Sequence, residues 1–429
     1  MLPFTIIDLN DTNIRIGKGE QILQNSPGYA VIKDGKIAFG SQAEKLNRIY
    51  PRSTHDDYWC RLSQDDIQST SNQIRHNADL AYMQLAEIYA QAGQTGKWLV
   101  AIPASYNQDQ ISLLLGLLNA ANYTEVKLID SALLASINSL SKGEHIHLDM
   151  QLHQSVLTTL DTDDKHKVTT SNVLPDAGLL SIYEKCAKLI SNEFINQSRF
   201  DPHHHAESEQ LLFENISSCL NKLNTSPMSK VDIEYQGKSY SANISHEAIV
   251  EVLSPIYDGI YRYIEDAKPL LLSHRFSMLP GFEENLSNVS LLDEFALFSS
   301  VKNYSSLLLD TDSNYLSELP VIEVKKEANL SKVTNNSTTD ITHLLINNIA
   351  YELKQHDCYI SDENNIETSL NSNTHFSIRF DGEQYLVNAE NKAQVSLNND
   401  IVKDNQLLKL GDNISVAGSE TNIILIKVS

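Results

Sequence analysis

The stretch Leu99–Asp130, LVAIPASYNQDQISLLLGLLNAANYTEVKLID, contains the pattern that decides the fold of this chain. Apolar residues at Trp98–Ile102 predict a buried strand, which is followed by a turn at Pro103. The apolar spacing over Asn107–Asn122 is that of a long amphipathic helix, and Val126–Ile129 predicts a second buried strand. Strand, helix and strand in this order indicate an α/β architecture.

The same kind of pattern opens both halves of the chain. Phe4–Leu9 predicts a strand that is followed by a turn and a second strand near Ile14. His145–Met150, HIHLDM, predicts another first strand, and Val156–Leu160 predicts its partner. Because each half begins with a strand pair that contains an aspartate, we expect a duplicated α/β architecture.

Turn residues and helical spacing divide the remaining sequence. Asp34-Gly35 is a strong hairpin signal. The other expected elements are strands Tyr29–Ile32 and Lys36–Phe39, helices Ser41–Ile49 and Asp65–Ala92, helices within Leu179–Leu223, a hairpin at Val231–Tyr240, a helix at Ser245–Ala267, strand Leu270–Leu272 and a helix opening at Pro280-Gly281.

Composition changes near Asp310. Residues 310–340 are rich in Ser, Asn, Thr, Asp, Glu and Lys, which predicts a linker. Short alternating apolar runs in Thr342–Ser429 then predict an all-β sandwich. The expected organisation is an α/β domain at residues 1–309, a linker at 310–340 and a β-sandwich at 341–429.

Charge and cysteine content limit the partners and the cellular compartment that we expect. The chain has 429 residues and a net charge of -22, from 33 basic and 55 acidic residues. Such a surface repels phosphate backbones and anionic lipid, so nucleic acid and membrane are not expected partners. The N-terminus MLPFTIIDLN lacks the features of a signal peptide. The four cysteines are scattered, which favours reduced thiols in a cytoplasmic protein.

Three segments share their order with the DnaK-type heat-shock chaperones. PGYAVIKDGKIAFGSQAEKLNRIYP at 27–51, the strand–helix–strand unit at 99–130 and SANISHEAIVEVLSPIYDGIYRYIEDA at 241–267 resemble segments of that family. The resemblance covers roughly residues 1–300. It implies the actin-like ATPase fold, whose two lobes enclose a nucleotide cleft.

The first phosphate loop of that family, DLGTTNS, is similar to DLNDTNI at 8–14. Asp8, Thr12 and Asn13 match it. Asn10 replaces the glycine, and Asp11 replaces a threonine and adds negative charge. Glycine in such a loop lets backbone N–H groups approach phosphate closely, and a side chain obstructs that approach.

The other nucleotide elements are altered as well. DMQLHQ at 149–154 falls on DLGGGT, so Asp149 matches while residues 151–153, including His153, replace all three glycines. SHRFSMLP at 273–280 falls on VGGSTRIP, with His274 and Arg275 in place of the glycine pair. Cys60 stands where the family has a lysine.

These substitutions predict a degenerate ATPase domain with no catalytic residues, and we expect no cofactor. The alternative is weak or remodelled binding of Mg-ATP. The remnant of the nucleotide cleft is expected to consist of Asp8, Asn10, Thr12, Asn13, Asp149, His153, His274 and Arg275.

The C-terminal segment resembles a forkhead-associated (FHA) domain, a fold that binds phosphothreonine peptides through its loops. SNTHFSI supplies Ser372 and His375 at the spacing of the family's SxxH, and SLNNDIV supplies Asn398. LLKLGDNISVAG is similar to the family's LxxGDxIxxG. The position of the phosphate-binding Gly-Arg is Ser361-Asp362, and an aspartate repels phosphate. The resemblance therefore implies an FHA-like module with lost or altered phosphopeptide recognition.

Other candidate sites carry weaker signals. His145, His147 and Asp149 alternate along a predicted strand, so they face one side and offer a possible metal-ligand set. Lining of the emptied cleft is the preferred interpretation, and no metal site is predicted. The three histidines at 203–205 are expected in a surface loop. Arg61 and Arg275 are candidates for holding an anion, against surface ion pairs.

The sequence thus favours a cytoplasmic bacterial protein that is not an enzyme. It would act as a scaffold or adaptor built on a pseudo-ATPase domain and an FHA-like domain, with protein partners whose identity the sequence does not reveal. The alternatives are a slow ATP-binding, chaperone-like switch and a phosphopeptide-binding adaptor.

Overall fold

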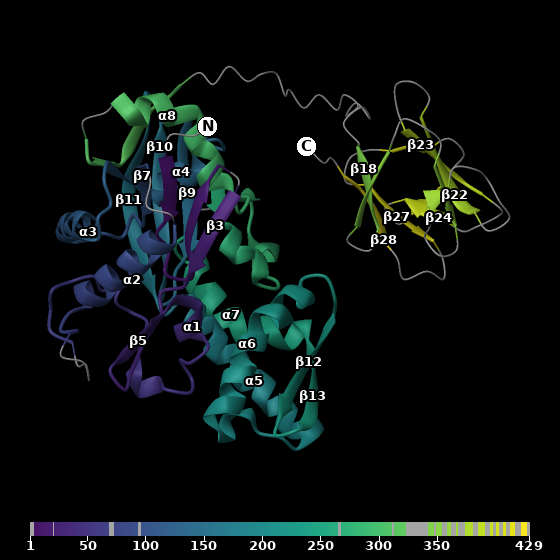
Figure 1. Ribbon diagram of the computed structural model, residues 1–429, viewed down its shortest axis with the longest axis horizontal. Helices are drawn as coiled ribbons and strands as arrows, with labels where there is room; N and C mark the ends of the chain where they lie inside the picture. The colour runs from purple at the N-terminus through teal and green to yellow at the C-terminus, as the bar shows by residue number, and fades with distance from the viewer. Residues whose placement is uncertain are drawn as a thin grey trace. The chain divides into compact units, whose positions relative to one another are not determined.

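The computed structural model divides the chain into two compact units, Met1–Val324 and Lys325–Ser429. Figure 1 shows the elements of each unit. The structure describes residues 4–19, 21–67, 73–92, 96–264, 267–310, 313–322, 342–346, 349–353, 358–361, 366–367, 374–380, 385–390, 395–397, 400–402, 406–408, 412–416 and 422–426.

The first unit contains a six-stranded sheet with the order β16-β8-β7-β1-β2-β3. β1, β2 and β3 form an antiparallel meander, and β7 and β8 continue the sheet in parallel with β1. The strands are β1 (Phe4–Asp8), β2 (Ile14–Lys18), β3 (Gln21–Ser26), β7 (Lys97–Ile102) and β8 (Val126–Asp130).

Helix α3 (Gln108–Ala120) connects the parallel strands β7 and β8. Asn107 caps it, because its side chain accepts a hydrogen bond from the Gln110 backbone N–H while Gln110 reaches back to Asn107. The buried residues Ile111, Leu114 and Leu118 lie on one helical face. The strand–helix–strand prediction for this stretch is therefore confirmed.

A second six-stranded sheet, β15-β14-β9-β10-β11-β17, repeats the connectivity of the first. β9, β10 and β11 form an antiparallel meander, and β14 and β15 continue the sheet in parallel with β9. The strands are β9 (Gly143–Met150), β10 (Gln154–Thr162), β11 (Lys165–Pro175), β14 (Leu270–Leu272) and β15 (Val289–Leu291). The expected duplication is thus present in the strand order.

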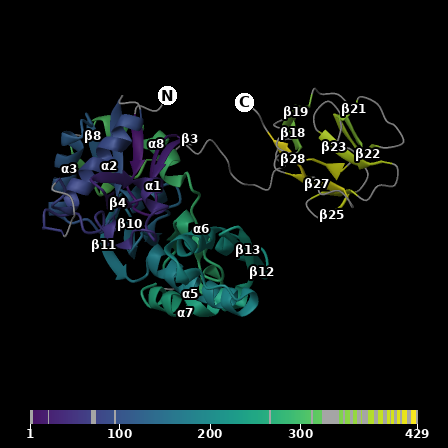
Figure 2. The same cartoon turned by 60° about the horizontal axis from the view of Figure 1, so that its bottom comes forward.

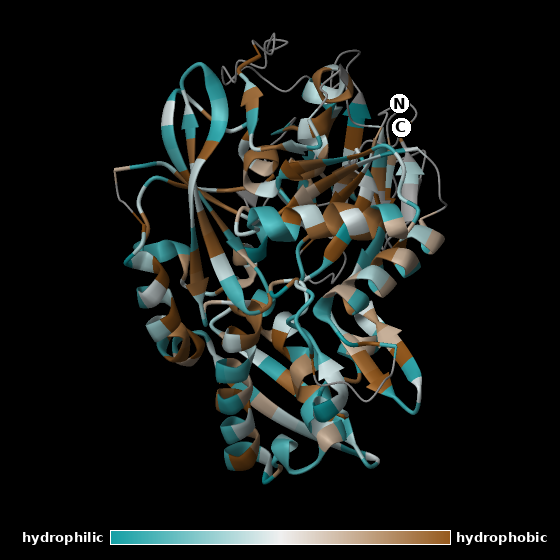
Figure 3. Ribbon diagram, turned by 90° about the vertical axis from the view of Figure 1, so that its left-hand side faces the viewer, coloured by the Kyte–Doolittle hydropathy of each residue, from teal (hydrophilic) through white to brown (hydrophobic). Residues whose placement is uncertain are grey.

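A smaller hairpin and a group of helices complete the first unit. Figures 1 and 2 show α5, α6 and α7 together with the β12–β13 hairpin. In Figure 3 apolar residues gather on the central strands, whereas the helices carry both polar and apolar residues. The bounds are β4 (Ala30–Lys33), β5 (Lys36–Phe39), α1 (Gly40–Glu44), β6 (Thr54–His55), α2 (Asn77–Gln91), α4 (Ser131–Ser136), α5 (Leu179–Ser198), α6 (Ala206–Leu223), β12 (Met228–Tyr235), β13 (Lys238–Ser245) and α7 (His246–Tyr261).

Several sequence expectations need correction. The helix expected from Asp65 begins only at Asn77, because His76 and Asp79 form a capping box there. The helix expected to open at Pro280-Gly281 is a short 3-10 turn, η4 (Glu283–Asn285).

Part of the expected linker belongs to the first unit. After α8 (Ala296–Asp310), β16 (Tyr315–Leu316) pairs with β8 and β17 (Glu318–Pro320) pairs with β11. A linker beginning at residue 310 is therefore wrong up to Pro320, whereas 323–341 lie outside the described residues.

The second unit consists of antiparallel strands in two sheets, β19-β18-β28-β27-β24-β25 and β21-β20-β22-β23-β26. Residues of both sheets, among them Leu344, Ile360, Phe376 and Leu425, form one core. The strands are β18 (His343–Ile346), β19 (Ile349–Glu352), β20 (Cys358–Ser361), β21 (Ile366–Glu367), β22 (Thr374–Phe380), β23 (Tyr385–Ala389), β24 (Val395–Leu397), β25 (Asp400–Ile401), β26 (Gln406–Leu407), β27 (Asn413–Val416) and β28 (Asn422–Ile426). The all-β prediction for this segment is confirmed.

In the described part of the chain, no helix has the length and apolar character needed to cross a membrane.

Candidate functional site

Two aspartates occupy matching positions in the two sheets of the first unit. Asp8 is the last residue of β1, and Asp149 lies near the end of β9, the first strand of the second meander. Both strands lead directly into the turn before the next antiparallel strand. A single guanidinium, that of Arg275, bridges the two carboxylates.

Arg275 lies in the 3-10 helix η3 (His274–Met278), which follows β14. Its Nη2 donates to Asp8 Oδ2 at 2.7 Å, and its Nη1 donates to Asp149 Oδ1 at 3.2 Å. Its Nε donates to Thr12 Oγ1 at 3.1 Å. All three nitrogens therefore have an acceptor, and the side chain occupies the space between the two aspartates.

A second arginine, Arg15, holds Asp8 from the neighbouring strand. Arg15 lies opposite Asp8 in the β1–β2 register, and its Nη2 and Nε donate to Asp8 Oδ2 at 2.9 and 3.2 Å. Its Nη1 donates to the Glu294 carbonyl at 2.8 Å. Arg15 is not among the site residues predicted from the sequence, although a charged residue between Ile14 and Ile16 on an apolar strand indicates a buried partner.

Asn10 fills the turn between the two halves. Its Nδ2 donates both to Asp149 Oδ2 and to the Met150 carbonyl, each at 2.9 Å. Its Oδ1 accepts hydrogen bonds from the backbone N–H and the hydroxyl of Thr12, at 3.0 and 2.7 Å. The Asn13 backbone N–H donates to the Asn10 carbonyl at 3.0 Å. The Asn10 amide thus occupies space between the turn and Asp149.

Asp8, Asp149, Arg15 and Arg275 form a group that we call the arginine cluster, and its positive and negative charges balance. Burial alone would raise the pKa of Asp8, but Arg275 and Arg15 outweigh it and bring the pKa to about 2. Burial raises the pKa of Asp149, but Arg275, together with smaller contributions from its other neighbours, lowers it overall. Burial and the two guanidiniums lower the pKa of His274 to about 3, so its imidazole is neutral. Two carboxylates therefore face two guanidiniums, and neither charge is left over.

Little space remains between the two aspartates, although a cavity of about 480 Å³ lies on the other side of Thr12, Arg15 and Arg275. The void beside Asp8, His147, Asp149 and Arg275 measures about 20 Å³. A void of that size holds about one water molecule. A phosphate group or a hydrated divalent cation would have to displace the Arg275 side chain before it reached either aspartate.

His153 lies outside the arginine cluster. Its Nε2 is 3.0 Å from Asp56 Oδ1. Burial lowers the pKa of His153, but this hydrogen bond and the nearby negative charges of Asp56, Asp11 and Asp57 together raise it. The neighbouring Leu152 backbone N–H donates to Asp11 Oδ1 at 2.8 Å. Burial raises the pKa of Asp11 to about 6. Of the eight expected cleft residues, His153 is thus the one that turns to a different partner.

The alternating His145, His147 and Asp149 do not converge. The His145 ring contacts the Ser141 hydroxyl at 3.0 Å, while Asp149 is held by Arg275. His147 is 2% exposed, and its ring nitrogens have no hydrogen-bond partner among the described residues. Within the same residues, no group of three or more His, Cys, Asp or Glu side chains is arranged to hold a metal ion.

The remaining candidates lie apart from the cluster. The histidines at 203–205 are exposed, and burial raises the pKa of the Cys60 thiol to about 12, so it is not a ready nucleophile. In the second unit, His375 lies on β22, where its carbonyl accepts a hydrogen bond from Glu390. Ser372 and Asn398 lie outside the described residues.

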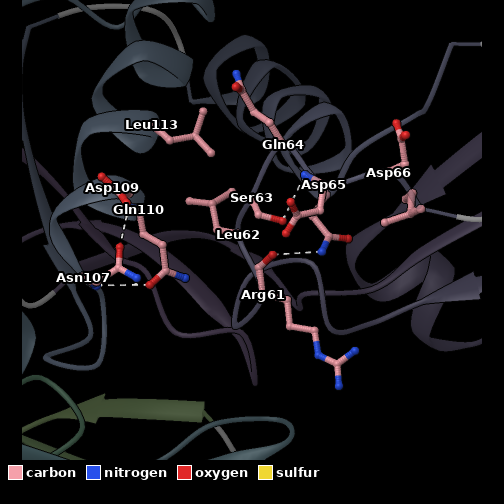
Figure 4. Close-up of a pocket in the computed structure, with 12 residues that line it drawn as sticks. Arg61, Leu62, Ser63, Gln64, Asp65, Asp66, Asn107, Asp109, Gln110 and Leu113 are labelled. Carbon is pink, nitrogen blue, oxygen red and sulfur yellow. Dashed lines mark hydrogen bonds between the residues drawn. The ribbon is translucent and has the colours of Figure 1, made fainter.

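A larger cavity, of about 830 Å³, shares no lining residue with the arginine cluster. It lies between residues 61–67 and the beginning of α3, and Figure 4 shows Arg61 directed away from Asp65 and Asp109. Arg61 is instead paired with Asp57 at 3.2 Å and is largely exposed. The lining of this cavity contains three aspartates, Asp65, Asp66 and Asp109, and Ser63, but neither histidine nor cysteine. Arg61 and Arg275 therefore do not form a joint anion site.

Asp130 is a buried carboxylate of the first unit that lies outside the arginine cluster. It is fully buried at the end of β8, where its Oδ1 caps α4 by accepting from the Leu133 backbone N–H at 2.9 Å. Its Oδ2 is buried without a hydrogen-bond partner among the described residues. Burial raises the pKa of Asp130 to about 7.

The raised pKa of Asp130 predicts that the stability of the folded chain depends on pH. As pH rises above the ordinary value of 3.8, the unfolded chain loses this proton while the folded chain keeps it up to about 7, so stability falls across that window. Asp130→Asn removes the titration. We expect its stability relative to wild type to improve by about 2 kcal/mol between about pH 5 and pH 6.5, measured by urea unfolding. Asp109→Asn, at an exposed position, should show no such trend, and parallel pH profiles of wild type and Asp130→Asn would contradict the prediction.

Comparison with known proteins finds no family model and no curated protein that matches this chain. Function is therefore inferred from the geometry of the arginine cluster.

Proposed function

We propose that the chain is a non-enzymatic scaffold or adaptor, built on an actin-like, DnaK-related pseudo-ATPase unit and an FHA-like unit. The observation that supports it best is the bridge from Arg275 to Asp8 and Asp149, at 2.7 and 3.2 Å. In an active relative, carboxylates at these positions would hold Mg²⁺ and its water. Here a protein cation takes that place permanently.

The arrangement of the sheets supports the actin-like part of this proposal. Each sheet combines a three-stranded antiparallel meander with two further strands parallel to its first strand. The two first strands bring Asp8 and Asp149 to the same arginine. This duplication supports the proposed two-lobed ATPase fold, in which the Arg275 side chain would lie between the two carboxylates of the nucleotide centre.

The scaffold role follows from what the cluster does not provide. Both aspartates of the cluster are paired with arginine, so under this proposal the domain would act through a fixed surface. Proteins are the expected partners, because the acidic chain disfavours nucleic acid and anionic membrane. The FHA-like unit would supply a second interaction surface.

Calorimetry with Mg-ATP tests the pseudo-ATPase. We expect no measurable binding at millimolar concentration, because the nucleotide would have to break the ion pairs of Arg275 and expose two buried carboxylates. Micromolar binding that disappears in Asp8→Ala would overturn the proposal and favour the alternative, a slow ATP-dependent switch.

Capture of partners separates the scaffold from the switch. Proteins retained by the full chain should be retained equally with Mg-ATP and with EDTA. Release of the same partners on addition of Mg-ATP would favour the switch.

A further inference from the structure

A second cavity, of about 310 Å³, lies between the α1 segment and helices α5 and α6. Tyr29, Glu44 and Lys45 line it from one side, and Tyr183, Phe213 and Glu214 line it from the helices. Its volume is at the lower end of the range for small-molecule sites. It shares no lining residue with the void of the arginine cluster.

Gln210 joins the two walls of this cavity. Its Nε2 donates to the Glu44 carbonyl and to Glu214 Oε1, each at 3.1 Å, and its Oε1 accepts from the Arg48 backbone N–H at 3.0 Å. Arg48 adds an ion pair to Glu184 on α5 at 2.6 Å. These hydrogen bonds and the ion pair fix the two walls of the cavity relative to each other.

The two glutamates that line the cavity, Glu44 and Glu214, are not held in ion pairs. No described residue forms an ion pair with Glu44 or Glu214 within 4.0 Å, and Lys45, although it lines the cavity, pairs with neither. Burial, followed by the charge of Glu214, raises the pKa of Glu44. With one lysine against two glutamates, the lining carries a net negative charge.

Tyr29 supplies a separate indication of a ligand. The residue is only 4% exposed and lines the cavity, yet no described residue makes a hydrogen bond to its hydroxyl. The Tyr29 hydroxyl therefore faces the cavity, where a ligand can form a hydrogen bond with it. A ligand N–H donor in the cavity would satisfy the Tyr29 oxygen and the Glu44 carboxylate together.

We propose that this cavity binds a small alkylammonium group. The ammonium would donate to the Glu44 carboxylate and the Tyr29 hydroxyl, while its alkyl chain would lie against the rings of Tyr183 and Phe213. Aromatic faces and carboxylates together favour cations. Phe213 already accepts a guanidinium on its ring, since Arg48 Cζ lies 3.6 Å from the centroid.

Calorimetry with 1,4-diaminobutane tests this site on the full chain. Wild type should bind it, and 1,4-butanediol, which has the same length without charge, should not bind. Glu44→Gln should weaken diamine binding at least about tenfold, because a charge-assisted hydrogen bond is lost. Tyr29→Phe should weaken it about threefold. Glu251→Gln, at an exposed position on α7, is the matched control and should bind like wild type.

The source of the amine is distinguished by a second probe, N-acetyl-lysine methylamide. Binding of this probe as tight as that of the diamine assigns the site to a lysine side chain of a partner, and binding of the diamine alone assigns it to a free amine. Absence of binding of both probes to folded wild type at millimolar concentration overturns the proposal, as does equal diamine binding by Glu44→Gln. Because Mg-ATP is not involved, failure here leaves the pseudo-ATPase proposal untouched.

Discussion

Replacing Arg275 with methionine should lower the free energy of unfolding by about 3–5 kcal/mol. The substitution keeps much of the side-chain volume but leaves Asp8 and Asp149 buried, close together and without the cation that lies between them. Urea unfolding measured by tryptophan fluorescence reports on this unit, because both tryptophans of the chain, Trp59 and Trp98, are buried in it.

Arg61→Met is the matched control for this experiment. Its guanidinium is also paired with an aspartate, but the side chain is 75% exposed, so the loss should stay below about 1 kcal/mol. Adding Asp149→Asn to Arg275→Met should recover part of the stability, because the uncompensated charge of Asp149 is then gone while Asp8 keeps its ion pair with Arg15. If Arg275→Met is tolerated as well as Arg61→Met, the aspartates do not need the cation, and the role assigned to Arg275 is wrong.

The same variant tests whether Arg275 takes the place of a metal ion. With the guanidinium removed, millimolar Mg²⁺ should raise the stability of Arg275→Met while leaving wild type unchanged. Two carboxylates and the hydroxyl of Thr12 are oxygen ligands of the kind that Mg²⁺ prefers. If Mg²⁺ does not change the stability of Arg275→Met, the two aspartates and Thr12 do not form a metal site, and the proposed replacement of a metal ion by Arg275 is wrong.

The fold was predictable where local signals agree with tertiary structure. In α3 the Asn107–Gln110 capping box, the helical spacing of leucines and the flanking apolar strands all point to one structure. The strand β11 was missed because most of its residues are polar and exposed, so it lacks an apolar stretch. The start of α2 was misplaced because apolar spacing continues before Asn77, whereas the cap at His76 decides where the helix begins.

The sequence predicted several residues of the site, but it did not predict which of them contact each other. Reading Asn10, His274 and Arg275 at glycine positions of the resembled loops predicted that side chains occupy the cleft. That Arg275 bridges Asp8 depends on residues 267 positions apart in the sequence, and no local pattern encodes such a contact. Arg15 is only seven positions from Asp8, but pairing of opposite residues across a hairpin becomes evident only when its register is known.

Gly178→Ala should have a comparably large effect, a loss of at least about 3 kcal/mol. Gly178 is the N-cap of α5 and has an ordinary extended backbone, with φ -91 and ψ 173, so left-handed strain is not the reason. The reason is contact, because an added Cβ would lie 2.3 Å from the Gln154 nitrogen and the His153 carbonyl carbon. Backbone atoms cannot rotate away as a flexible side chain can.

The turn that Gly178 contacts is fixed from several sides, and this makes relaxation costly. The Leu179 and Leu180 backbone N–H groups donate to the carbonyls of Gln151 and Leu152, each at 2.9 Å, so moving α5 away breaks both bonds. Gly259→Ala in α7 is the control, since a Cβ there meets nothing within 4 Å and should stabilise the chain by about 0.5–1 kcal/mol. A Gly178→Ala protein that unfolds at the same urea concentration as wild type would mean that this turn yields freely, and the Leu152–Asp11 hydrogen bond beside the arginine cluster would then be no rigid part of the cleft.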